Sequence, residues 1–156
     1  MKDLQGKILT LAPNRVWRPY LGGRILDQLE GQTHPTDSHF GEDWIASLTR
    51  AVNAGREHID EGVSSVIVDG KKIPLPEVLA TDAAYFLGAK HVEAYGTRLM
   101  FLVKFLDSAI RLPIQTHPTI PFAQKHLGSN SGKTEVYYVL STRPSAIAVA
   151  CRNGRP

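Results

Sequence analysis

The sequence contains very little cysteine, no long apolar run and no leader-like start. Cys151 is the only cysteine among 156 residues, so the chain cannot form an internal disulfide, and such sparing use of cysteine is typical of a reducing compartment. No apolar segment approaches the roughly 20 residues that a membrane-spanning helix needs. Residues 1–5 lack the apolar core of a signal peptide. We therefore expect a soluble, cytoplasmic protein with no membrane partner.

The chain also lacks a strong excess of charge of either sign. Its 18 Lys and Arg residues stand against 15 Asp and Glu residues, a formal net charge of +3. The basic residues are scattered, and Lys71 and Lys72 form the only adjacent pair. A nucleic-acid-binding surface usually shows clustered basic residues, so we expect no nucleic-acid partner. A mild positive balance suits an anionic small molecule equally well.

Size and periodicity predict one domain, residues 1–156, that is rich in short strands. We expect strands at residues 8–11, 44–48, 99–106 and 112–117. Asp69 and Gly70 predict a tight turn that joins strands 66–68 and 71–73, and residues 135–140 and 145–150 resemble a second hairpin. Helices are expected at 25–29, 76–87 and 122–126, and a polar loop at 31–41. Short strands separated by turn residues are typical of a sandwich or jelly roll with a few small helices.

One group of residues has the chemistry of a metal site. Gln115 and His117 alternate with Thr116, so an extended strand would place both side chains on one face. A carboxylate from a second segment, such as Glu135, would complete a set of amide, imidazole and carboxylate donors that suits zinc. From these residues alone, the alternative is an ordinary hydrogen-bonded cluster, because a strand histidine is more commonly a structural residue than a metal ligand.

A wider pattern of ordered motifs resembles the type I, cupin-fold mannose-6-phosphate isomerases. Trp17 precedes Gly22 and Gly23, and Gly41-Glu42-Asp43-Trp44 is followed by Ser47. Further along the chain come Phe101-Leu102-Val103-Lys104-Phe105-Leu106-Asp107, then Gln115-Thr116-His117-Pro118, then Gly132-Lys133-Thr134-Glu135. The similarity runs from about Leu11 to the end of the chain. It implies a mainly β, cupin-type jelly roll.

The resemblance also implies an activity and roles for particular residues. The activity is zinc-dependent aldose–ketose isomerisation between mannose 6-phosphate and fructose 6-phosphate, with a small sugar phosphate as the partner. The metal ligands of the family fall on Gln115, His117 and Glu135. Its substrate-binding residues fall on Trp17 and Lys104. Lys133 and Glu42 become the candidate catalytic residues, whereas Trp44 is assigned to the core.

Two departures from the family pattern affect this expectation. Pro113 and Thr119 stand where the family commonly has Ser and Asp, which bears on substrate preference more than on metal binding. The family also supplies a histidine ligand and an arginine from a later strand that this chain does not show. We therefore expect an incomplete jelly roll, equivalent to the amino-terminal part of such an isomerase. That part would pair with a carboxy-terminal half and could be inactive alone; the alternative is a non-catalytic cupin module that binds a metal or a sugar phosphate.

Overall fold

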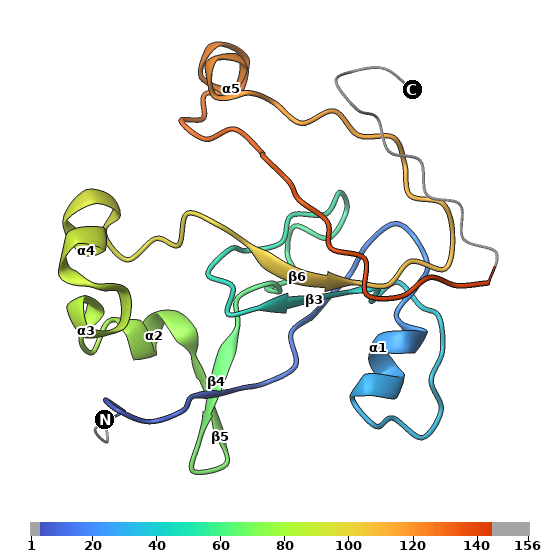
Figure 1. Cartoon of the computed structure of the whole chain (residues 1–156), viewed down its shortest axis with the longest axis horizontal. Helices are drawn as coiled ribbons and strands as arrows, with labels where there is room; N and C mark the ends of the chain where they lie inside the picture. The colour runs from blue at the N-terminus through green and yellow to red at the C-terminus, as the bar shows by residue number, and fades with distance from the viewer. Residues whose placement is uncertain (1–3, 145–156) are drawn as a thin grey trace. The chain divides into compact units, whose positions relative to one another are not determined.

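The computed structural model describes residues 4–144, which belong to two compact units. The first unit is Met1–Ile110 and the second is Arg111–Pro156. The first contains two small antiparallel sheets and four short helices among its described residues, and the second contains one helix among residues 111–144 (Figure 1). The fold is thus mixed, with two three-stranded sheets rather than a clearly β-dominated architecture. The assignment of residues 1–156 to one domain stays a prediction.

The first sheet contains the predicted Asp-Gly hairpin. Its strands are β1 (Thr10–Leu11), β4 (Ser65–Val68) and β5 (Lys71–Pro74), in the antiparallel order β1-β4-β5 (Figure 1). Asp69 and Gly70 have φ angles of 50° and 74°, the left-handed backbone that a two-residue turn of this kind requires. The hairpin prediction is confirmed.

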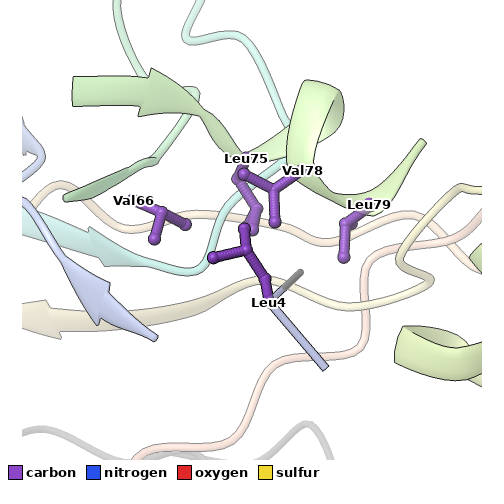
Figure 2. Packing of buried hydrophobic residues seen from close by; sticks show 5 residues of the cluster. All are labelled: Leu4, Val66, Leu75, Val78 and Leu79. Carbon is purple, nitrogen blue, oxygen red and sulfur yellow. The ribbon is translucent and has the colours of Figure 1, made fainter. Parts of the chain in front are cut away.

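Helix α2 (Leu75–Leu79) follows β5 directly and supplies most of the first core. Leu75, Val78 and Leu79 lie at the spacing that gathers side chains on one helical face. They pack with Leu4 and Val66, and all five are at most 8% exposed (Figure 2). Pro76 lies in the first turn of α2, where the missing amide hydrogen costs no hydrogen bond.

The second sheet positions the first group of candidate residues. Its strands are β2 (Arg15–Val16), β3 (Glu42–Ile45) and β6 (Val103–Leu106), in the antiparallel order β2-β3-β6. Trp44 pairs with Lys104 across β3 and β6, and Trp44 is buried beside Val16 and Ala51. The strand predicted at 44–48 lies at 42–45 instead, because Ala46 adopts a positive φ of 49° that ends the extended backbone.

The helices agree with the sequence in part. Helix α1 (Arg24–Leu29) and helix α5 (Ile120–His126) lie where helices are predicted. The single helix predicted at 76–87 is wrong, because the chain forms α2 and then α3 (Ala83–Leu87). Asp82 accepts a hydrogen bond from the Tyr85 amide and begins the new helix, as N-cap residues do. Helix α4 (Ala89–Tyr95) was not predicted.

The second unit differs most from the sequence-based expectation. Among residues 111–144, the structure assigns no strand, so the strands predicted at 112–117 and 135–140 are wrong. Both segments lack a ladder partner in the described residues, and side chains such as Ile114 and Val136 are 88% and 89% exposed. The predicted strand 145–150 lies outside the described residues. Across the described residues, no helix is both long enough and apolar enough to cross a bilayer.

Candidate functional site

The structure brings together the three predicted metal ligands. His117 Nε2 lies 3.0 Å from Glu135 Oε2 and 3.5 Å from Gln115 Oε1. Lys133 joins them, because its Nζ is 3.3 Å from His117 Nε2 and 3.5 Å from Glu135 Oε2. We call these four residues the 115–135 cluster. Amide, imidazole, carboxylate and ammonium groups therefore meet at one point in the second unit.

A close backbone approach, rather than a sheet, brings the two halves of this cluster together. The Lys133 amide donates to the Pro118 carbonyl at 3.0 Å. A Cβ atom on Gly132 would lie 2.8 Å from that carbonyl oxygen, so only glycine fits there without a shift of the backbone. The contact places residue 133 next to residue 118, and His117 and Glu135 then face each other.

Helix α5 spans the interval between the two halves. Thr119 acts as its N-cap and accepts a hydrogen bond from the Phe122 amide. The aspartate that the family commonly has at this position is also a favoured N-cap residue, so the departure at Thr119 preserves the local structure. The turn before α5 and the return at Gly132 together position the cluster.

The donor types suit zinc, and the two separations that involve His117 are compatible with a shared ion. Ligands about 2.1 Å from a tetrahedral zinc ion lie about 3.4 Å from each other, close to the 3.0 and 3.5 Å separations at His117 Nε2. No group of three His, Cys, Asp or Glu side chains among residues 4–144 could hold a metal ion. A metal site in this cluster would therefore need Gln115 as its third protein ligand.

Lys133 contacts two of the same ligand atoms, so a bound cation would compete with its ammonium group. The Lys133 side chain is 53% exposed, whereas those of His117 and Glu135 are 26% and 14% exposed. An exposed lysine on a flexible stem can move aside at little cost. A metal cation could thus replace the Lys133 ammonium group beside His117 and Glu135 while these two side chains stay in place.

A second group of predicted residues surrounds a buried carboxylate in the first unit. Glu42 is 3% exposed. Its Oε1 accepts hydrogen bonds from Tyr20 Oη at 2.6 Å and Lys104 Nζ at 3.2 Å. Its Oε2 accepts hydrogen bonds from Trp44 Nε1 at 2.7 Å and Arg18 Nε at 2.8 Å. We call these five residues the Glu42 network.

The network holds Glu42 in its ionised form. Burial alone would raise the pKa of this carboxyl group. The hydrogen bonds from Tyr20 and Trp44, followed by the positive charge of Lys104, outweigh burial and lower the pKa of Glu42 from 4.5 to about 2. A carboxylate with so low a pKa and four donors around it is a weak proton acceptor near neutral pH. The surroundings of Glu42 therefore favour an anchoring role over a role as catalytic base.

The buried carboxylate also explains the lysine in the apolar strand β6. Lys104 is only 21% exposed, and Glu42 supplies the counter-charge that a poorly hydrated ammonium needs. Trp44 is buried as predicted, and its indole N–H also donates a hydrogen bond to Glu42. Arg18 lies over the Trp44 ring at 4.8 Å from its centroid.

Trp17 lies beside this network, in contact with other side chains. Its ring stacks on His39 at a centroid distance of 5.1 Å, and the Arg56 guanidinium lies 5.0 Å from the ring centroid. Its carbonyl accepts a hydrogen bond from Asn53, which in turn accepts one from Arg18. Substrate binding by Trp17 stays a prediction.

Sequence reasoning did not find Arg18 and Tyr20. The two residues alternate around Pro19, and that spacing is the signal that could have placed both on one face of an extended segment. Their common target, Glu42, is more than 20 residues away. The local sequence around Arg18 and Tyr20 does not indicate that a carboxylate so distant in the sequence binds both side chains.

Comparison with models of protein families, with curated proteins and with solved structures found no match to this chain.

Proposed function

We propose that this chain carries the metal centre of a zinc-dependent aldose–ketose isomerase that interconverts mannose 6-phosphate and fructose 6-phosphate. The observation that carries the proposal is the contact of two side-chain oxygens with His117 Nε2. Gln115 Oε1 lies 3.5 Å from this nitrogen and Glu135 Oε2 lies 3.0 Å from it. The ordered motifs that resemble the type I isomerases support it. The two separate antiparallel sheets are in keeping with part of a two-sheet, cupin-type jelly roll.

The residues suit the chemistry of this reaction. Isomerisation removes a proton from the carbon next to a carbonyl and returns a proton to the neighbouring carbon, while negative charge develops on the sugar oxygens. Zinc held by Gln115, His117 and Glu135 would supply Lewis-acid stabilisation of that charge. Lys133 lies beside the ligands on an exposed side chain, where its ammonium can neutralise charge on the substrate.

The same geometry separates the roles of the two candidate catalytic residues. Glu42 is held as an anion by four donors, so we assign it to the support of Lys104 rather than to proton transfer. Lys133 is the better candidate for a proton carrier, because its amine is accessible and close to the other polar groups.

The proposal is tested by following the conversion of mannose 6-phosphate to fructose 6-phosphate with zinc-loaded protein. With this chain paired to the expected carboxy-terminal half, we expect turnover that ends when zinc is removed with a chelator and returns when zinc is restored. Lys133→Met should abolish turnover and leave zinc binding intact, whereas Lys125→Met in helix α5 serves as the matched control. Zinc binding without turnover of any sugar phosphate would instead identify a non-catalytic binding module.

A further inference from the structure

Two of the three proposed ligand atoms share the ammonium group of Lys133. His117 Nε2 and Glu135 Oε2 are 3.0 Å apart, and Lys133 Nζ lies 3.3 Å from the first and 3.5 Å from the second. A zinc ion about 2.1 Å from each of the two ligand atoms would lie no more than about 4.5 Å from this position of the ammonium nitrogen. Two positive charges repel each other at that distance, so a bound metal cation drives the ammonium away.

The backbone of Lys133 is held in place, whereas its side chain can swing. The Lys133 amide donates to the Pro118 carbonyl at 3.0 Å, so the residue itself stays beside the ligands. Its side chain is 53% exposed, and a flexible lysine stem can reorient in water at little cost. The side chains of His117 and Glu135 are more enclosed, at 26% and 14% exposed. Metal binding therefore moves the lysine ammonium and leaves these two donor atoms in position.

From these contacts we infer that Lys133 is an internal competitor for the metal, and that its positive charge lowers the metal affinity of the 115–135 cluster. The metal centre itself rests on the proposed function, and Lys133 adds a means of regulating it. Metal binding and release of the ammonium become one event, because both cations use His117 Nε2 and Glu135 Oε2. A modification that neutralises Lys133, such as acetylation, would raise the metal affinity.

A zinc titration of the full chain by calorimetry at low ionic strength tests this competition. Lys133→Met keeps the three ligands and removes the charge, so zinc should bind about 5-fold more tightly, as expected for loss of an exposed ion pair. Lys133→Arg keeps a positive charge and should bind zinc with an affinity close to that of the wild type. Lys125→Met removes an equal charge from the last turn of helix α5 and should leave the affinity unchanged.

Salt distinguishes competition between charges from a change in packing. The charge of Lys133 is screened as the Debye length falls from about 30 Å at 0.01 M salt to about 3 Å at 1 M salt. The ratio of the zinc affinities of Lys133→Met and the wild type should therefore decrease toward 1 as salt is added. A ratio that does not change with salt would show that the methionine acts through packing, and it would overturn the inference.

The outcomes also separate the role of Lys133 from the existence of the metal centre. Zinc binding by Lys133→Met that is equal to or weaker than that of the wild type would overturn the competition and leave the metal centre standing. No zinc binding by either protein would overturn both. Tighter zinc binding by Lys133→Met, without turnover of a sugar phosphate by the wild type, would support the competition and identify a non-catalytic metal-binding module.

Discussion

The Glu42 network and the 115–135 cluster hold similar side chains in opposite ways. Glu42 is buried on a paired strand, and its four donors come from strands β3 and β6 and from the segment that follows β2. His117 and Glu135 lie on segments without strand pairing, and one backbone hydrogen bond between Lys133 and Pro118 joins these segments. Ala123 is the one buried hydrophobic residue in the described part of the second unit.

The two sites differ in what holds their polar side chains in place. The Glu42 network is complete within the protein, because every charge in it has a partner, and removal of one member should damage the fold. The 115–135 cluster has little packing beneath it and depends on Gly132 and helix α5. A bound metal would contribute much of the stability of that cluster, since metal binding and local folding are coupled.

Removal of the Glu42 carboxylate should have the largest effect on stability. Glu42→Ala leaves Arg18 and Lys104 without their shared counter-charge, and breaking a buried ion pair in this way costs about 3–5 kcal/mol. Urea unfolding followed by fluorescence of the two tryptophans measures the loss. Asp60→Ala, which removes an 87% exposed partner of Arg50, is the control and should cost less than about 1 kcal/mol. Equal losses in both variants would contradict the account.

Acid should weaken the first unit through the same carboxylate. The pKa of Glu42 is lowered from 4.5 to about 2 in the folded protein. Its contribution is therefore complete above pH 4.5 and is lost as the pH falls toward 2, by on the order of 3 kcal/mol in total. The free energy of unfolding, measured from pH 6 to pH 2, should fall more steeply in the wild type than in Glu42→Gln. Parallel curves would show that Glu42 has an ordinary pKa.

Loss of one hydrogen bond to Glu42 should have an intermediate effect. Tyr20→Phe removes the 2.6 Å donor and keeps the buried ring. Hydrogen bonds to charged groups contribute about 1.5–3 kcal/mol, so the variant should be destabilised by that amount and its acid transition should move to higher pH. Tyr95→Phe in helix α4 removes a hydroxyl from a half-exposed ring and should change neither property.

A methyl group on Gly132 should act on the second unit alone. Gly132→Ala pushes the backbone away from Pro118 and separates Glu135 from His117, so we expect zinc affinity to fall about 10-fold, which corresponds to about 1.4 kcal/mol. Asn130→Ala, two residues away, is the control. Calorimetric titration with zinc measures the affinity, and urea unfolding of the first unit should be unchanged. Unaltered zinc affinity in Gly132→Ala would show that the close approach does not position the ligands.

The sequence predicted local features well where the backbone itself carries the signal. Asp69 and Gly70 identify their turn because the turn requires positive φ angles. The break between α2 and α3 was missed, although Asp82 is a capable N-cap, because the apolar pattern continues across it. The meeting of Gln115, His117 and Glu135 was anticipated, but the reason given, two neighbouring strands, was wrong. The backbone contact at Gly132 depends on the return of the chain after α5, which no local pattern specifies.

The Glu42 network was less predictable than the metal ligands. The sequence raised the question of why a lysine lies in an apolar strand, but the answer depends on a carboxylate 62 residues earlier. Arg18 and Tyr20 complete the shell from a third segment. Such networks are defined by tertiary packing, and their members resemble ordinary surface residues until the sheet brings them together.

The central claim, that Gln115, His117 and Glu135 hold one cation, is tested most directly by zinc stoichiometry. The account predicts one zinc ion per wild-type chain after dialysis, and none per chain for His117→Ala. His126→Ala, which removes a histidine from the last turn of helix α5, should retain one zinc ion. An unchanged zinc content in His117→Ala would contradict the proposed metal centre.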